Sequence, residues 1–156
     1  MYEIEAGLVD RTTRLLAGRH SALITDVDGT ISPIVAEPEL AAVLPRARAA
    51  LAGLAQRLEL VAVVSGRTVA DARRLVGLDG LVYVGNHGLE VDDQVVAEAR
   101  PWVARLGAVL DDLRQELPDP GVRIENKGVT GSITTGWPPT RSGRGGNCSN
   151  RSPAAR

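Results

Sequence analysis

Phenylalanine is absent from this 156-residue sequence, and aromatic residues together make up only 3% of it. Because 44% of the residues are nevertheless hydrophobic, the core has to be built from Val, Leu, Ile and Ala. Cys148 is the single cysteine, which excludes an intramolecular disulfide and a zinc site built on several cysteines. The formal net charge of −1 gives no electrostatic reason to expect binding to nucleic acid or to an anionic membrane.

Long apolar runs are also missing. No stretch approaches the roughly 20 apolar residues that a membrane-spanning helix needs. Residues 1–5, Met-Tyr-Glu-Ile-Glu, are acidic, unlike the start of a signal peptide. We therefore expect a soluble cytoplasmic protein, of a length that suits about one domain.

The composition changes abruptly near residue 134. All 19 acidic residues lie within residues 1–133, whereas residues 134–156 contain four Arg, no acidic residue and no Leu, Ile or Val. Such a segment buries too little apolar surface to offset the conformational entropy lost on ordering. We therefore expect a disordered tail over residues 134–156.

Residues 23–30, Leu-Ile-Thr-Asp-Val-Asp-Gly-Thr, carry the strongest chemical signal in the chain. An apolar strand ends in Asp26 and Asp28, and residues two apart on a strand face the same side. Two carboxylates so close repel each other, which a hard divalent cation such as Mg²⁺ would relieve. One carboxylate could then attack a phosphorus atom while the other exchanges a proton with the leaving oxygen.

Two simpler interpretations of this segment exist. Asp-Gly pairs are common in turns, and Asp-x-Asp-Gly also occurs in calcium-binding loops. The calcium loop requires Gly at its sixth position, where Ile31 stands, and the loop would contain Pro33. We therefore favour phosphoryl transfer. The segment resembles the first motif of the haloacid dehalogenase superfamily of phosphatases, which form an aspartyl-phosphate intermediate.

Apolar segments alternate with helical patterns through the first half of the chain. Strands are expected over residues 21–26, 58–64 and 81–84, and helices over residues 40–57 and 68–75, the second capped by Thr68. Residues 1–19 are weakly helical, and residues 31–39 form a loop or flap. This order predicts an α/β fold, a partial Rossmann-like parallel sheet with helices on both faces. Ligands bind beyond the carboxyl ends of such strands.

The pattern changes after residue 88. Residues 89–96 alternate as in a hairpin, residues 100–117 form an amphipathic helix, and residues 121–133 alternate as in one strand of a half-exposed sheet. These elements predict the beginning of an α+β cap. The expected division is a phosphatase core over residues 1–85, a partial cap over residues 86–133, and the tail.

Three further clusters carry polar side chains: two follow predicted strands, and the third lies within residues 121–133. Ser65-Gly66-Arg67 supplies a hydroxyl, amides at a helix N-terminus and a guanidinium, each suited to a phosphate. The segments Gly-Asn-His-Gly-Leu-Glu and Glu-Asn-Lys add four polar side chains, those of His87, Glu90, Glu125 and Lys127. Taken singly, the three clusters could be a common loop, a turn and a solvated charge pair.

Together and in this order, the four motifs resemble trehalose-6-phosphate phosphatases over about residues 20–133. The resemblance implies that Asp26 is the nucleophile and a Mg²⁺ ligand, and that Asp28 is the general acid and base with its main-chain carbonyl also on the metal. The phosphate-binding residues would be Thr30, Ser65 and Arg67. The residues near the sugar hydroxyls would be His87, Glu90, Glu125 and Lys127. The implied reaction converts trehalose 6-phosphate and water into trehalose and phosphate.

The chain departs from the family after Ile133. The superfamily's third-motif Lys or Arg and fourth-motif acidic pair have no counterpart there, and Lys127 matches the cap's own Glu-x-Lys. Family members usually continue with His-Tyr-Arg. Loss of one nucleotide from codons for His-Tyr-Arg-Leu gives Thr-Thr-Gly-Trp, the residues at 134–137. We therefore expect a frameshifted or truncated chain with negligible catalysis.

Other interpretations stay open. The substrate could be another sugar phosphate, such as sucrose phosphate or mannosyl-glycerate phosphate. The chain could also be a non-catalytic remnant that binds a phosphorylated sugar, or a partner of a trehalose-phosphate synthase.

Overall fold

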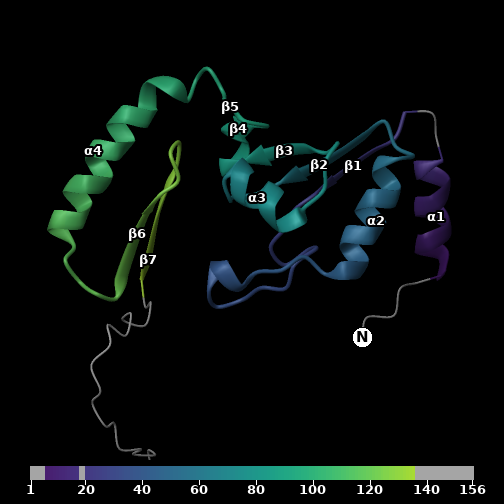
Figure 1. Ribbon diagram of the computed structural model, residues 1–156, viewed down its shortest axis with the longest axis horizontal. Helices are drawn as coiled ribbons and strands as arrows, with labels where there is room; N and C mark the ends of the chain where they lie inside the picture. Colours follow the sequence, from purple (N-terminus) through teal and green to yellow (C-terminus); the bar gives the residue numbers. More distant parts are fainter. Residues whose placement is uncertain (1–5, 18–19, 136–156) are drawn as a thin grey trace, which may run out of the picture.

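The computed structural model describes residues 6–17 and 20–135 (Figure 1). The elements of the first part are α1 (Ala6–Leu16), β1 (Ala22–Thr25), η1 (Pro38–Leu40), α2 (Pro45–Ala55), β2 (Leu60–Val64), α3 (Val69–Val76), β3 (Val82–Gly85), η2 (Asn86–Gly88), β4 (Glu90–Val91) and β5 (Gln94–Val95). Those of the second part are α4 (Arg100–Glu116), β6 (Val122–Asn126) and β7 (Gly131–Thr135).

The main sheet of the described residues has the strand order β1-β2-β3-β4-β5. Strands β1, β2 and β3 are parallel, with Thr25 opposite Val63 and Val63 opposite Tyr83. Strands β4 and β5 are antiparallel and form the short hairpin expected over residues 89–96. The α/β fold with a partial parallel sheet is therefore confirmed. Its parallel strands bring their carboxyl ends to one edge.

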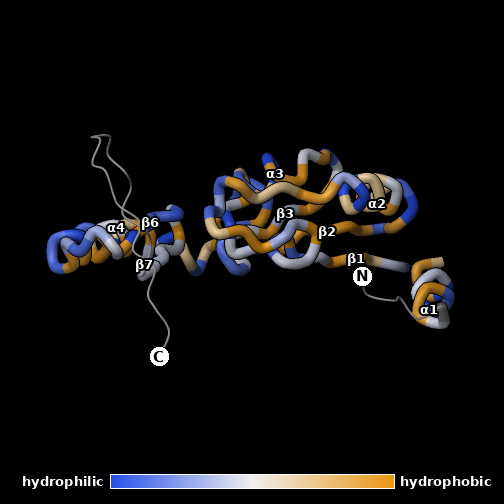
Figure 2. The backbone as a smooth tube through the Cα atoms, turned by 90° about the horizontal axis from the view of Figure 1, so that it is seen from below, coloured by the Kyte–Doolittle hydropathy of each residue, from blue (hydrophilic) through white to orange (hydrophobic). Residues whose placement is uncertain are grey.

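The expectation of helices on both faces of this sheet is wrong for the crossover helices. Helices α2 and α3 lie on the same side of β1–β3 (Figure 2). The strand order explains this, because both crossovers step in the same direction and each βαβ connection is right-handed. Helix α1 does not cover the other face, since nearly all of its side chains are exposed.

The core lies between the sheet and these two helices. As expected, it consists mainly of Val, Leu, Ile and Ala side chains, and Val63, Val69 and Val76 are fully buried. Tyr83 is the largest fully buried side chain, and its hydroxyl donates to the Leu78 carbonyl at 2.7 Å. The one aromatic ring of the core therefore keeps its polar tip hydrogen-bonded.

Helix α2 begins five residues later than the expected residue 40. Its first residue is Pro45, whose missing N–H is tolerated at the first helical position and not further inside. The residues before it are extended, and buried Ala41 and Val43 join the core. The helical spacing of apolar residues before Pro45 therefore misled the prediction.

The second part packs a hairpin on a helix. The single strand expected over residues 121–133 is wrong, because β6 and β7 pair antiparallel around a turn in which Gly128 has a φ of +86°. Leu110 of α4 is 3% exposed and lies over Gly131 of β7. The amphipathic helix expected over residues 100–117 is confirmed as α4, although Trp102 remains 60% exposed.

The tail expected from residue 134 falls largely outside the described residues, which end at Thr135. Strand β7 includes Thr134 and Thr135, which pair with Arg123 and Val122. The division at residues 85 and 133 stays a prediction. Among the described residues, the structure has no helix both long and apolar enough to cross a membrane.

Candidate active site

The two aspartates of the first motif lie just beyond β1. The strand ends at Thr25, so Asp26 and Asp28 belong to the turn that follows it. Val27 between them is fully buried, and its carbonyl accepts the amide of Ser32 at 2.9 Å. Val27 faces the core, whereas its two acidic neighbours are exposed. Gly29 adopts a φ of +82°, which closes the turn.

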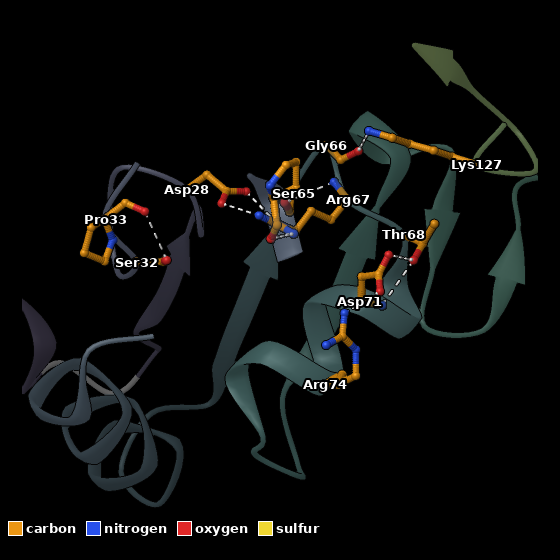
Figure 3. Close-up of polar contacts among 11 residues, drawn as sticks. Asp28, Ser32, Pro33, Ser65, Gly66, Arg67, Thr68, Asp71, Arg74 and Lys127 are labelled. Carbon is orange, nitrogen blue, oxygen red and sulfur yellow. Dashed lines mark hydrogen bonds and ion pairs between the residues drawn. The ribbon is translucent and has the colours of Figure 1, made fainter. Parts of the chain in front are cut away.

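Arg67 joins this turn to the loop after β2. Its Nε donates to Asp28 Oδ2 and its Nη2 to Asp28 Oδ1, both at 2.8 Å (Figure 3). Nη1 donates to the Pro38 carbonyl at 3.2 Å, so Arg67 also contacts the flap of residues 31–39. The hydrogen bonds that Arg67 donates to Asp28 raise the pKa of Arg67 above its usual value, which keeps the guanidinium charged. Two parallel bonds fix the plane of the carboxylate as well as its position.

Ser65 occupies the equivalent position at the end of β2. It is 4% exposed, and its hydroxyl oxygen accepts the amide of Arg67 at 3.2 Å. Since β1 and β2 are adjacent and parallel, Asp26 and Ser65 follow strands that end side by side. The sequence prediction that these two motifs meet is therefore consistent with the fold. The individual roles of Asp26, Thr30 and Ser65 remain predictions.

Helix α3 starts directly after this loop. Thr68 caps it as expected, because its hydroxyl oxygen accepts the amide of Asp71 at 3.1 Å. Asp71 Oδ1 accepts from Arg74 Nη2 at 2.9 Å (Figure 3). That hydrogen bond lowers the pKa of Asp71. The first turn of α3 therefore presents a fixed ion pair beside the Ser65–Arg67 loop.

The loop after β3 packs closely against the same region. Asn86 and His87 both have left-handed backbones, with φ values of 50° and 59°. A Cβ at position 66 would lie 2.6 Å from Cε1 of His87, so Gly66 is what lets the ring approach. His87 therefore lies beside the candidate phosphate loop, and its contact with a sugar stays a prediction.

The carboxylate of Glu90 accepts two hydrogen bonds from within the protein. Its Oε2 accepts the Val69 amide at 3.0 Å and Asn86 Nδ2 at 2.9 Å. The carboxylate therefore supports the start of α3 and the Asn86 loop. It does not line the cavity described below, and its contact with a sugar stays a prediction.

The hairpin β6–β7 supplies the remaining predicted residues. Lys127 Nζ donates to the Gly66 carbonyl at 3.3 Å (Figure 3). Arg123 Nη2 donates to Glu39 Oε1 at 2.9 Å, which joins the hairpin to the flap. The hydrogen bond between these two side chains lowers the pKa of Glu39 and raises that of Arg123. The hairpin thus contacts both the flap and the loop after β2.

These segments surround a cavity of about 450 Å³. Five of the predicted site residues line it, namely Asp28, Arg67, His87, Glu125 and Lys127. Four do not, namely Asp26, Thr30, Ser65 and Glu90. The prediction missed four polar lining residues, namely Glu39, Thr68, Asp71 and Arg74. The spacing Thr-x-x-Asp at positions 68–71 is a helix-start signal that could have pointed to two of them.

The donors present fit Mg²⁺ only in part. The carboxylate of Asp26 makes no hydrogen bond within the described residues and is exposed, so it suits a hard cation. Both oxygens of Asp28 are bound to Arg67, which leaves its main-chain carbonyl for a metal. No group of three metal-ligating side chains occurs within residues 6–17 and 20–135. Protein sites for Mg²⁺ commonly use one or two carboxylates plus water, so Asp26 meets the minimum.

Comparison with known proteins identifies the relatives of this segment. It is 41% identical over 120 residues to a trehalose-phosphate phosphatase of Mycobacterium avium, a match covering 72% of this chain and 30% of the relative. It is 49% identical over 122 residues to an uncharacterised glycosyl hydrolase of Mycobacterium tuberculosis, covering 73% of this chain and 9% of that protein. The same segment therefore occurs in proteins of very different length, and this chain spans less than a third of the curated relatives named here.

A solved structure and a family model agree with these relatives. The structure of a trehalose-6-phosphate phosphatase related protein superposes with a TM-score of 0.58 at 26% identity, covering 69% of this chain and 48% of that one. The sequence model of the trehalose-phosphatase family matches residues 24–135, which include all nine predicted site residues. The chain belongs to the trehalose-phosphatase family.

Proposed function

We propose that this chain carries the nucleophile and part of the sugar-binding surface of a phosphatase that hydrolyses trehalose 6-phosphate. One observation carries the proposal. The fork of Arg67 on Asp28 joins the Asp-Val-Asp-Gly-Thr turn to the Ser65 loop, at a cavity that the β6–β7 hairpin also lines. Membership of the trehalose-phosphatase family supports the choice of substrate.

The proposed reaction has two steps, each written for the residues of this chain. A carboxylate oxygen of Asp26 attacks the phosphorus, and the bond between phosphorus and the sugar oxygen breaks. Asp28 gives a proton to that leaving oxygen, and then takes a proton from the water that attacks the phospho-aspartate. The products are trehalose, phosphate and the regenerated carboxylate of Asp26.

The ion pair bears on this chemistry. Arg67 donates to both oxygens of Asp28, and each oxygen keeps a further lone pair for the transferred proton. Movement of Arg67 toward the phosphoryl group would free one oxygen completely. The Pro38 carbonyl already accepts one of its N–H groups, and a phosphoryl oxygen could accept another.

The part of the proposed site that would bind the sugar carries side chains of both charge signs. Glu125 and Lys127 line the cavity from the hairpin, and His87 lines it from the core. Sugar hydroxyls both donate and accept hydrogen bonds, so a lining that offers carboxylate, ammonium and imidazole groups suits them. The pair Asp71 and Arg74 extends this lining along α3.

We propose Mg²⁺ as the cofactor, held by the carboxylate of Asp26 and the main-chain carbonyl of Asp28. When bound, it would offset the repulsion between the Asp26 carboxylate and an approaching phosphate. Because no group of three metal-ligating side chains occurs within the described residues, we propose weak metal binding and negligible hydrolysis by this chain alone. A trehalose-phosphate synthase as partner and a cytoplasmic location are the remaining parts of the proposal.

The test measures binding and turnover by the full chain with Mg²⁺. We expect trehalose 6-phosphate to raise the melting temperature, sucrose phosphate to raise it less, and phosphate release to stay at the level of the buffer. Phosphate release that Asp26→Asn abolishes would show that the chain is catalytic, which contradicts the proposed inactivity. Equal shifts with both sugar phosphates would favour the broader class of sugar phosphates, and no shift with either would refute the proposed binding.

A further inference from the structure

The buried side chain of Asn86 makes contacts that the proposed chemistry does not use. The residue is 1% exposed. Its Nδ2 donates to Glu90 Oε2 at 2.9 Å and to the main-chain oxygen of Lys127 at 3.4 Å. Its Oδ1 accepts the hydroxyl of Thr130 at 2.6 Å. One carboxamide therefore connects strand β4 of the main sheet with the turn between β6 and β7.

The core end of this connection is rigidly placed. The amide of Asn86 donates to the Arg67 carbonyl at 2.7 Å, and the amide of His87 donates to the Ser65 carbonyl at 3.2 Å. A Cβ at position 85 would lie 2.5 Å from the amide nitrogen of Val69, so the loop is packed against the start of α3. The main chain of Asn86 is thus held in place by the Ser65–Arg67 loop and the start of α3.

The hairpin end is a closed turn. The amide of Lys127 donates to the Thr130 carbonyl at 2.8 Å, and Gly128 N–H donates to Asn126 Oδ1 at 2.8 Å. Lys127 reaches the cavity from this turn, and its Nζ donates to the Gly66 carbonyl at 3.3 Å. If the turn moves relative to Asn86, the ammonium group of Lys127 moves with it.

We infer that Asn86 is a positioning residue whose carboxamide holds the turn of residues 127–130 against the core and so places Lys127 at the cavity. The contact stands on the geometry alone. Its importance for the sugar rests on the proposed function. The short bond from Thr130 is the main attachment, because the bond to the Lys127 carbonyl is long.

The chain offers a specific probe of this contact. Lys127 is the only lysine in the sequence, so acetic anhydride finds a single side-chain amine to acetylate, and peptide mapping separates it from any acetylated Tyr or Cys. The labelled α-amino group is separated from it by peptide mapping. The initial rate of Lys127 acetylation in the full chain then reports how often the ammonium group leaves its place beside Gly66.

Position 130 allows a matched pair of variants. Thr130→Ser keeps the hydroxyl that Asn86 accepts, whereas Thr130→Val keeps the shape and loses the hydroxyl. We expect Thr130→Val to raise the acetylation rate about three- to tenfold, the change that loss of one hydrogen bond allows, with Thr130→Ser close to wild type. Asn86→Ala should raise the rate at least as much as Thr130→Val.

Three results would overturn the inference. They are equal rates in all variants, an equal rise in both Thr130 variants, and a rise matched by faster hydrogen exchange in β1–β3, which would mean global unfolding. A separate arm adds ligand. Trehalose 6-phosphate should slow acetylation of wild type, and inorganic phosphate should not. Failure of that arm counts against the proposed function, whereas the comparison of Thr130→Val with Thr130→Ser still decides the role of Asn86.

Discussion

Among the single residues, Arg67 connects the Asp28 turn with the flap. It contacts the carboxylate of Asp28 with two N–H groups and the carbonyl of Pro38 with a third. Lysine carries the same charge but cannot form the two parallel bonds. We expect Arg67→Lys to lower the free energy of unfolding by about 1 kcal/mol, because the Arg67 side chain is only 15% exposed while that of Asp28 is 40% exposed.

Urea denaturation at neutral pH measures this loss, and Arg46→Lys provides the control. Arg46 is exposed on α2 and makes no side-chain hydrogen bond or ion pair within the described residues. Equal effects of the two substitutions would show that the bidentate geometry contributes nothing beyond charge.

The ion pair of Asp71 and Arg74 predicts a pH dependence of stability. The hydrogen bond from Arg74 lowers the pKa of folded Asp71, so the stabilisation is present above the unfolded value of about 3.9 and is lost as pH falls through the lower folded value. Asp71→Asn should therefore reduce stability by about 0.5 kcal/mol at pH 7, a value discounted for solvent exposure, and by less near pH 2.5.

Denaturation curves of wild type and variant across this pH range provide the measurement. Arg74→Gln removes the same pair from its other side. The double variant should cost no more than the larger single effect, and strict additivity would show that the two side chains act independently.

At the scale of elements, the close packing of β3 on α3 depends on a glycine. A Cβ at position 85 would lie 2.5 Å from the Val69 amide nitrogen and 2.9 Å from the Arg67 carbonyl oxygen. Both are main-chain atoms, so the steric clash can be relieved only if the start of α3 moves. We expect Gly85→Ala to destabilise the chain by about 1–3 kcal/mol.

A matched control exists in α2. Gly53 has no atom within 4 Å of its would-be Cβ and lies inside the helix. Gly53→Ala should therefore stabilise the chain by about 0.5–1 kcal/mol. Thermal and urea midpoints of both variants decide the matter. A Gly85→Ala variant as stable as wild type would mean that the contact between β3 and α3 adjusts easily.

The elements also show what the sequence could and could not predict. Strands β1, β2 and β3 were predicted because continuous apolar runs of three to five residues fit parallel strands of a sheet. The start of α2 was misplaced because apolar spacing continues before Pro45. The break between β6 and β7 was missed because Gly128 interrupts an alternation that otherwise continues.

At the scale of the whole molecule, the meeting of Asp28 with Arg67 was predictable, since both follow parallel strands in a βαβ unit. The contact of Glu39 with Arg123 was not, because it joins a flap to a hairpin 84 positions away and no local pattern marks either residue. The role of Glu90 was also hidden, because a carboxylate near a cavity looks the same in sequence whether it faces a ligand or an amide.

The outer strand of the main sheet leads to a prediction about association. Strand β1 pairs only with β2 within the described sheet, which leaves its other edge unpaired. Ile24 on this strand is 66% exposed. An open edge with an exposed apolar side chain is a template for pairing with another chain. We therefore expect the protein to self-associate with rising concentration through β1.

Ile24→Lys should weaken this association, because a charge on an edge strand opposes pairing. Val109→Lys is the matched control, since Val109 is 52% exposed on α4, away from the β1 edge. Light scattering across a concentration series should show the apparent mass falling several-fold with Ile24→Lys and little change with Val109→Lys. If both substitutions lower the apparent mass equally, net charge and not the β1 edge controls association. If wild type stays monomeric at high concentration, the β1 edge does not mediate self-association in solution.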